Sequence, residues 1–481
     1  NLGLLKMLQV FNNLFKKLHA ENIIFCNWKD HHAIEQHLSG DGDLDLFVPI
    51  GYKAKFEEIA QLEGYRRVIS YQANHDYIEH YFGLDHATSK FVHIHVYFKI
   101  ITGEHASKNY DLPLENYILK NLDTSSYLPT INIAGKHAIF LIRYFLKIGS
   151  IYGLFQYWRE SEKYLNEWHS YDHAFNFESI LELGISRNEL NEMNKVYEST
   201  SFFKKLLLSI KLKRKLKGSR RRAYFWHQIF IIQNLILRVF NRFFFRKQKI
   251  LIPGIVVAIC GLDGSGKSSV VSTLEANFST HFCTKVFHLG RPASNTFTFF
   301  FNLFIATYSF LKRIRVKQAS LLAIPSKKVS LIYAMRSVLL AYDRKTQSNK
   351  AYNYSRNGYI VICDRYPGLE NGKMDSPRIP ENKSRGLAYQ FCFNLEQRLY
   401  RSIKQATFIF QLSVPLEVAI HRNSLRNKFG KETEDELRER FFVNSDAKFL
   451  GENYHTIDAS TSFSTVLKKV LGGIWYSKNW N

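Results

Sequence analysis

The stretch GLDGSGKSS, residues 261–269, directly follows an apolar run at residues 255–260. It matches the pattern GxxxxGK[ST], and the helical run SSVVSTLEANF leads out of it. In such a strand, turn and helix, successive backbone N–H groups converge on phosphate oxygens at the helix N-terminus. Only glycine lets the backbone approach so closely. The sequence therefore predicts a phosphate-binding loop in a unit that begins near residue 250.

The loop residues have expected roles toward ATP and Mg²⁺. Lys267 would neutralise the β and γ phosphates, and the Ser268 hydroxyl would ligate Mg²⁺. Further along the chain, GYIVICDRYPG ends a strand with Asp364 and Arg365. We expect Asp364 to hold the magnesium through water and Arg365 to reach a phosphate on the acceptor. The residues expected to contact the nucleotide are Gly261, Asp263, Gly264, Ser265, Gly266, Lys267, Ser268 and Ser269.

Length, charge and cysteine usage limit the architecture and the partners. A chain of 481 residues predicts two or three domains. The formal net charge of +24 favours phosphates, nucleic acid or an anionic membrane surface as partners. The 5 cysteines are widely spaced and include no CxxC pair, which indicates a reducing, cytoplasmic compartment.

The rhythm of strand and helix signals predicts an α/β protein in three regions. Residues 1–145 alternate the strand-like NIIFCNW, DLDLFVPI and KFVHIHVYF with the helical KAKFEEIAQLEGY. Residues 146–249 form a basic, aromatic-rich helical connector, with ten lysines and arginines between 204 and 222. From 250 to 481, strands recur with helices between them, which predicts a parallel sheet flanked by helices.

Two apolar stretches, residues 224–245 and 297–315, raise the question of membrane contact. Each is too short or too polar to span a bilayer. Each can lie on an anionic membrane as a basic amphipathic helix, or pack between or over the domains. Nucleic-acid binding by residues 204–222 ranks lower, because that tract lacks interleaved aromatic residues. Assembly into a homodimer remains open.

A charged helix predicted downstream offers further arginines. HRNSLRNKFGKETEDELRERF places Arg422 and Arg426 four residues apart, hence on one face. Arginines that close over a phosphoryl group stabilise the charge on its equatorial oxygens during transfer. The alternative interpretation is a solvated charged helix.

Taken together, five segments resemble the motifs of thymidylate kinases, a branch of the P-loop nucleoside-monophosphate kinases, in the order found there. They are GLDGSGKSS, HLGRP at 288–292, ICDRYP at 362–367, the arginine-rich 421–440 and HTIDAS at 455–460. The resemblance covers about 250–481. It implies an Mg-ATP-dependent phosphotransferase with the P-loop kinase fold.

The resemblance also implies roles for single residues. Asp263 would face the acceptor, Arg291 and Arg365 would bind its phosphate, and Arg422 and Arg426 would belong to a closing lid. Gly264, rather than an arginine, follows Asp263. The resemblance therefore places the catalytic arginine in the lid.

The acceptor side departs from the family pattern. GLENGKMDSPRIP follows ICDRYP, where thymidylate kinases hold the base, and an aromatic, basic insertion occupies 293–330. We therefore expect the acceptor to be a nucleoside monophosphate or another phosphorylated or hydroxyl compound. The alternative function is a nucleic-acid-binding or sensing P-loop ATPase.

In the first region, HLSGDGDLDLFVPI carries Asp43 and Asp45 at alternate strand positions. Two carboxylates on one strand face can share a divalent metal. With the glycine turn before them, they resemble the nucleotidyltransferase fold over about 20–145, in which a later strand adds a third carboxylate. Here KFVHIHVYF offers His93 or His95 instead. Two alternatives follow: nucleotidyl transfer with altered metal chemistry, or only binding of a nucleotide or sugar phosphate. Lys29 is either a phosphate contact or a plain surface lysine.

Overall fold

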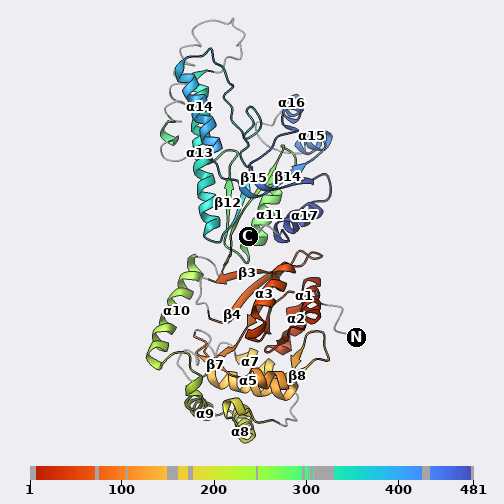
Figure 1. Cartoon of the computed structure of the whole chain (residues 1–481), viewed down its shortest axis with the longest axis vertical. Helices are drawn as coiled ribbons and strands as arrows, with labels where there is room; N and C mark the ends of the chain where they lie inside the picture. Colours follow the sequence, from red (N-terminus) through yellow and green to blue (C-terminus); the bar gives the residue numbers. More distant parts are fainter. Residues whose placement is uncertain are drawn as a thin grey trace. The chain divides into compact units, whose positions relative to one another are not determined.

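The computed structural model describes residues 7–70, 75–104, 107–148, 161–171, 177–244, 248–294, 298–301, 303, 307, 330–424 and 434–477. The chain divides into two compact units, Asn1–Ile252 and Pro253–Asn481, and Figure 1 labels many of their elements. The helical residues expected to form a connector fall in the first unit. Each unit is described separately.

The first unit is built on a mixed eight-stranded sheet with the order β10-β3-β4-β5-β2-β1-β9-β8. The pairs β2–β5 and β1–β9 are parallel and the other neighbours are antiparallel. Its strands are β1 Cys26–Asn27, β2 Asp43–Phe47, β3 Arg66–Ser70, β4 Ile78–Leu84, β5 Phe91–Tyr97, β8 Leu122–Asp123, β9 Thr130–Ile131 and β10 Lys249–Leu251, and a separate hairpin pairs β6 Ile100–Thr102 with β7 Tyr110–Leu112.

Alternation along the strands gives this sheet two different faces. Leu44 and Leu46 of β2 join one core with residues of α1 (Gln9–Ala20) and α3 (Lys53–Leu62). Asp43, Asp45 and Phe47 point the other way. On that second face Phe47 joins a core built around α5 (Ile133–Lys147).

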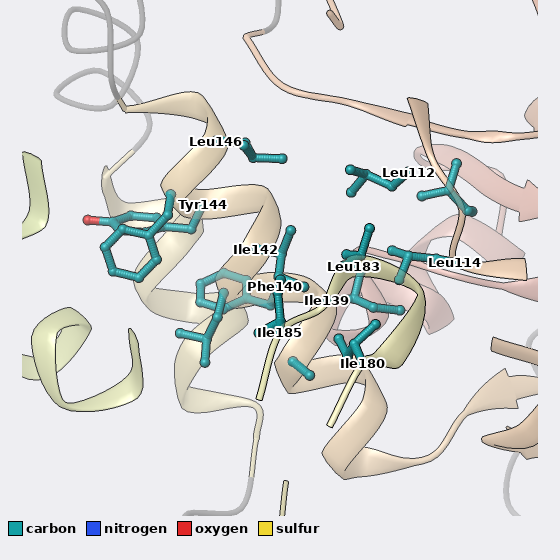
Figure 2. Packing of buried hydrophobic residues seen from close by; sticks show 14 of the residues in the cluster. Leu112, Leu114, Ile139, Phe140, Ile142, Tyr144, Leu146, Ile180, Leu183 and Ile185 are labelled. Atoms are coloured by element: carbon teal, nitrogen blue, oxygen red, sulfur yellow. The ribbon is translucent and has the colours of Figure 1, made fainter. Parts of the chain in front are cut away.

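Helix α5 is apolar almost all round, so it is buried between the sheet and further helices. Figure 2 shows Ile139, Phe140 and Ile142 of α5 close to Leu112 and Leu114 and to the turn around Leu183. Residues from the helical region share this core, which explains why that region belongs to the first unit. The remaining helices are α2 Ile34–Leu38, α4 Glu115–Lys120, α7 Ser161–His169, α8 Arg187–Glu198, α9 Phe202–Lys215 and α10 Tyr224–Phe244.

The second unit contains the predicted parallel sheet, which is thus confirmed. Its strand order is β12-β13-β11-β14-β15, and each of the four neighbouring pairs is parallel. The strands are β11 Ile255–Gly261, β12 Thr284–His288, β13 Ile360–Asp364, β14 Ala406–Ser413 and β15 Gly451–Asp458. All five were anticipated from their apolar runs. In the first unit, β1, β2 and β5 were anticipated and the other strands were not.

Helices cover both faces of the second sheet. Val256, Ala258 and Cys260 of β11 pack with residues of α13 (Leu331–Arg356) and α14 (Leu387–Arg401). The alternate residues face α11 (Lys267–Ser279) and α17 (Phe463–Trp475); a Cβ at Gly473 of α17 would lie 2.7 Å from the Phe410 ring. The helices α15 Leu416–Ser424 and α16 Glu434–Asn444 follow β14.

The sequence predicts that neither of the two apolar stretches spans a bilayer. Among the described residues, none of the helices combines the length and apolar character required to cross a bilayer. The stretch 224–245 becomes α10, up to Phe244. Most of 297–315 lies outside the described residues.

A fully buried arginine organises the loops at one end of the second sheet. Arg344 of α13 donates to the carbonyl oxygens of Leu289 and Gly290 and to the Tyr400 hydroxyl. Its guanidinium also lies 2.7 Å from Oδ1 of Asp375. A buried charge needs such complete pairing, because its hydration is lost on folding.

We predict that Arg344→Leu destabilises the second unit by about 3–5 kcal/mol, because it leaves Asp375 and two carbonyl groups buried with fewer partners. Arg356→Leu, at the exposed end of the same helix, is the control and should change stability by less than about 0.5 kcal/mol. Hydrogen exchange of the β11 and β13 amides, measured by mass spectrometry, reports on this unit alone. Equal protection in both variants would contradict the prediction.

Candidate functional site

The phosphate loop joins the fully buried central strand β11 to helix α11. Gly261, Gly264 and Gly266 all have positive φ, at 139°, 90° and 87°. A Cβ at Gly261 would lie 2.4 Å from the Leu412 carbonyl oxygen, and one at Gly264 would lie 3.0 Å from that of Ala419. Glycine is therefore required at these positions for two reasons: the backbone conformation and the close packing against the neighbouring segments.

Lys267 begins α11, and its side chain folds back over the loop. The Nζ atom donates to the Leu262 carbonyl oxygen at 2.7 Å and lies 3.6 Å from Oδ1 of Asp263. Burial, and to a lesser degree the nearby Arg365, lower the pKa of Lys267 to about 8. A buried ammonium group held at a loop carbonyl is available to a phosphate that enters the loop.

Asp263 is the centre of a charge network within this unit. Its Oδ1 lies 2.6 Å from Nη2 of Arg365, and its Oδ2 lies 3.0 Å from Nη1 of Arg440 in α16. Burial raises the pKa of Asp263, but Lys267, Arg365 and Arg440 together outweigh it and hold that pKa below its ordinary value. The carboxylate is thus charged near neutral pH and draws cations from three elements to the loop.

Asp364 ends β13, the strand next to β11. Its Oδ2 lies 3.2 Å from Nδ1 of His288, while its Oδ1 is buried without a hydrogen-bond partner among the described residues. A buried carboxylate oxygen in that state fits a ligand to magnesium or to magnesium-bound water. Ser268, in the first turn of α11, and Ser269 are exposed, so their hydroxyl groups are accessible.

Arg365 is held in an unusual backbone conformation between two carboxylates. Its φ is 69°, a left-handed value that costs energy for a residue with a side chain. Its Nη1 contacts Sδ of Met374 at 3.0 Å and Oδ2 of Asp375 at 3.4 Å, while Nη2 is on Asp263. Such strain, stored at a strand end beside the loop, indicates a functional position.

The unfamiliar segment after Tyr366 is fixed by buried polar groups. Asp375 within it bonds to Arg344 and Arg365. Glu396 of α14 is fully buried and accepts the backbone N–H groups of Arg378 and Ile379. The segment is therefore a defined wall beside Arg365.

The other arginines that the sequence predicts for the site lie in different surroundings. Arg422 donates to the Ala459 carbonyl oxygen at 3.0 Å and to that of Gly264 at 3.5 Å, so it braces the phosphate loop from outside. Arg426 lies outside the described residues. Arg291, which follows Gly290 in the chain, is exposed. Gly290 itself is close to Arg365, since a Cβ there would clash with that side chain.

Sequence reasoning missed three participants in this site: Arg440, Arg344 and Asp375. Arg440 lies at the end of the arginine-rich segment that was expected to form the lid, but no motif in that segment marked it as a partner of Asp263. Arg344 and Asp375 lie in segments read only as a helix and as a departure from the family pattern. Their contacts join residues distant in sequence, so local patterns do not reveal them.

The first unit brings its predicted residues together on one sheet face. The register pairs Asp43 with His93 and Asp45 with His95 on the parallel strands β2 and β5. Oδ1 of Asp43 lies 2.7 Å from Nδ1 of His93, and Oδ1 of Asp45 lies 3.3 Å from Nδ1 of His95. Both histidines therefore occupy the positions where a third carboxylate was sought.

Lys29 is not a plain surface lysine. Its Nζ lies 2.9 Å from Oδ1 of Asp45 and donates to the Tyr97 hydroxyl at 3.0 Å. Burial lowers the pKa of Lys29, but Asp45 and its other anionic neighbours outweigh burial and raise that pKa above its ordinary value. Sequence reasoning also missed His80 of β4, whose Nδ1 lies 3.2 Å from Nε2 of His93.

Comparisons with known proteins place these sites in context. No known family model matches the chain. The chain is 25% identical over 222 residues to the "uncharacterized ATP-binding protein YghR" of Escherichia coli K12, which covers 45% of this chain and 85% of that protein. It is 30% identical over 129 residues to the "uncharacterized ATP-binding protein YghS" of the same strain, with 26% and 54% covered.

Two solved structures are also similar to part of the chain. One is the thymidylate kinase of Candida albicans, at 19% identity and a TM-score of 0.29, covering 48% of this chain and 94% of that one. The other is the deoxyadenosine kinase of M. mycoides with bound dATP, at 16% identity and a TM-score of 0.23, covering 46% and 99%. Both are kinases. The second unit itself has a P-loop arrangement, a phosphate loop between the central strand of a parallel sheet and a helix.

Proposed function

We propose that residues 253–481 transfer a phosphoryl group from Mg-ATP to an acceptor. The observation that carries this proposal is the phosphate loop, in which three glycines of positive φ precede a buried lysine at a helix N-terminus. Converging N–H groups and Lys267 would bind the β and γ phosphates. The two E. coli relatives are named as ATP-binding proteins, which agrees with ATP as the phosphoryl donor.

Magnesium fits the oxygen donors beside the loop. Ser268 and Asp364 would hold the ion, and the ion would neutralise charge on the transferred phosphoryl group. Lys267 would exchange the Leu262 carbonyl oxygen for phosphate oxygens on nucleotide binding. Asp364 would remain oriented by His288 while its partnerless oxygen faces the ion or a bound water.

Arg365 and the segment after it support an acceptor that carries a phosphate or hydroxyl group. Asp263 and Asp375 hold the Arg365 guanidinium beside the loop, where it would bind the acceptor anion. The acceptor class we propose is a nucleoside monophosphate or another phosphorylated or hydroxyl compound. The wall of Met374 and Asp375 replaces the family's base-binding segment and would select within that class.

We predict that Lys267→Ala lowers the transfer of label from γ-labelled ATP to its acceptor by at least about 100-fold, since the variant loses the charge over the β and γ phosphates. Lys285→Ala, on the exposed side of edge strand β12, is the matched control and should transfer at the wild-type rate. The acceptors tested are nucleoside monophosphates, sugar phosphates and polyprenols.

Undiminished transfer by Lys267→Ala would contradict the site assignment. Hydrolysis of ATP that rises with DNA or RNA, with no transfer to any acceptor, would favour the alternative of a nucleic-acid-binding P-loop ATPase.

Arg440 is the lid arginine that we propose for the transition state. Arg422 is tied to two carbonyl groups, whereas Arg440 is 41% exposed and is held to Asp263 by an ion pair that substrate could displace. A lid arginine that reaches the loop at this carboxylate can move to the equatorial oxygens of the phosphoryl group.

Arg440→Ala should therefore lower kcat on the order of 100-fold while changing the Kd for ATP by less than about threefold. Arg438→Ala is the control, because Arg438 is exposed and pairs with Glu434 in the same helix, so this variant should leave kcat unchanged. Steady-state kinetics and equilibrium nucleotide binding separate the two effects. A loss of ATP affinity that matches the loss of kcat/KM would assign Arg440 to ground-state binding instead.

The first unit presents a second candidate function, contact with an anionic membrane surface. Helix α10 reverses the usual distribution of polar and apolar side chains. Polar His227, Asn234 and Asn241 are buried, and most of the aromatic side chains are exposed. His227 is anchored to the Ser107 hydroxyl at 2.7 Å. The exposed apolar residues of α10 are Tyr224, Phe225, Trp226, Ile232, Ile236, Leu237, Val239, Phe240, Phe243 and Phe244.

Charge decides which partner this face fits. Residues 202–244 contain twelve lysines and arginines and no aspartate or glutamate. A basic segment with exposed aromatic side chains matches the interface of a bilayer that contains acidic lipids. Nucleotidyl transfer by the same unit remains a hypothesis, which Asp43 and Asp45 support and the histidines opposite them oppose.

We predict that the full chain cosediments with phosphatidylserine-containing vesicles and that Phe225→Glu/Phe243→Glu weakens this binding at least about tenfold, because each glutamate opposes both burial and the lipid charge. Gln233→Glu, exposed on the same helix, is the control for charge and should reduce binding far less. Absence of binding to these vesicles would contradict the proposal. A dimer in light scattering that the double variant dissociates would assign the face to self-association.

A further inference from the structure

The first unit contains a cluster of three histidines on one face of its sheet. His80 on β4 lies opposite His95 on β5, and His93 lies two residues before His95. One ring nitrogen of each histidine lies within 4.8 Å of the others. The rings of His93 and His95 have centroids 4.3 Å apart, and those of His80 and His95 have centroids 4.4 Å apart.

We propose that His80, His93 and His95 bind a divalent transition-metal ion of the zinc class. Ligand nitrogens about 2.0–2.1 Å from a tetrahedral Zn²⁺ lie about 3.3 Å from one another. Nδ1 of His80 and Nε2 of His93 are already 3.2 Å apart, so an ion fits between them with little movement. The ion belongs to the first unit and does not depend on phosphoryl transfer by the second.

The carboxylates of β2 supply the outer support that metal-binding histidines require. Oδ1 of Asp43 accepts from Nδ1 of His93 at 2.7 Å, which leaves Nε2 of that ring for the metal. Oδ1 of Asp45 lies 3.3 Å from Nδ1 of His95, which leaves Nε2 of His95 for the metal. Lys29 also lies at Oδ1 of Asp45, at 2.9 Å, and holds that carboxylate in place. The two aspartates predicted as magnesium ligands thus orient imidazoles.

Asp43 also determines how the site opens. Its Oδ2 lies 3.6 Å from Nε2 of His95, near enough to become a fourth ligand after a small rotation. The Asp43 side chain is 53% exposed, whereas that of His93 is 6% exposed. The metal site would therefore be closed to solvent on the sheet side and open to solvent beside Asp43. A water or an anionic oxygen of a substrate can bind the ion there.

The donor set selects the metal. Imidazole nitrogen suits Zn²⁺, Co²⁺, Ni²⁺ and Fe²⁺, whereas Mg²⁺ prefers oxygen ligands in octahedral geometry. Lys249, whose Nζ lies 4.7 Å from the centre of the Phe82 ring, is a competing cation on this face. Asp43 and Asp45 offset its charge and that of the ion.

Metal binding by the full-length protein tests the proposal. After removal of metals with a chelator, the protein is titrated with Co²⁺, whose visible absorption reports a tetrahedral nitrogen site, and then with Zn²⁺ in the presence of excess Mg²⁺. We expect one Co²⁺ per chain, displaced by Zn²⁺ and not by Mg²⁺. His80→Gln should weaken Zn²⁺ binding at least about 100-fold and abolish the spectrum. His86→Gln, in the exposed turn between β4 and β5, is the matched control and should keep both.

Two results would overturn the proposal. One is a wild-type protein that gives no tetrahedral Co²⁺ spectrum. The other is a His80→Gln variant with wild-type Zn²⁺ affinity. Asp43→Asn tests the supporting role and should weaken Zn²⁺ binding about 10- to 100-fold while one ion per chain is still bound. Circular dichroism of each metal-free variant checks that its fold is retained.

Discussion

The second unit depends on the contact between Gly261 and the carbonyl group of Leu412. At this point the central strand β11 must leave the sheet and enter the phosphate loop, and a Cβ at Gly261 would lie 2.4 Å from that carbonyl oxygen. The close approach fixes where the loop begins relative to β14. It also brings Lys267 over the loop and places Asp263 within reach of Arg365 and Arg440. A side chain at residue 261 would disturb all of these contacts together.

Charge pairing then completes the site around the loop. Arg365, with its strained backbone, is held by Asp263 on one side and by Asp375 on the other, and Asp375 is itself held by the buried Arg344. Arg365 is therefore positioned on the acceptor side before a substrate binds. Preorganisation of this kind is how phosphoryl-transfer sites stabilise charge without rearranging water. In the first unit, His93 and His95 stand on β5 opposite Asp43 and Asp45, where a third carboxylate was expected.

The sequence predicted what depends on local patterns. The five apolar runs of the second unit became its five parallel strands, and the glycine spacing of 261–266 became three residues of positive φ. Two contacts escaped prediction because they join distant segments: Arg344 with Asp375, and Arg440 with Asp263. His80 escaped because β4 follows no clear alternation, so its place opposite His95 appears only in the register of the sheet.

A crystal structure with Mg²⁺ and a non-hydrolysable ATP analogue is the most direct test of the central claim, that residues 261–268 bind the phosphates of the donor. We expect the β phosphate within the loop, Nζ of Lys267 moved from Leu262 to phosphate oxygens, and the ion beside Ser268 and Asp364. Nucleotide bound elsewhere, with Lys267 still on the Leu262 carbonyl oxygen, would contradict it.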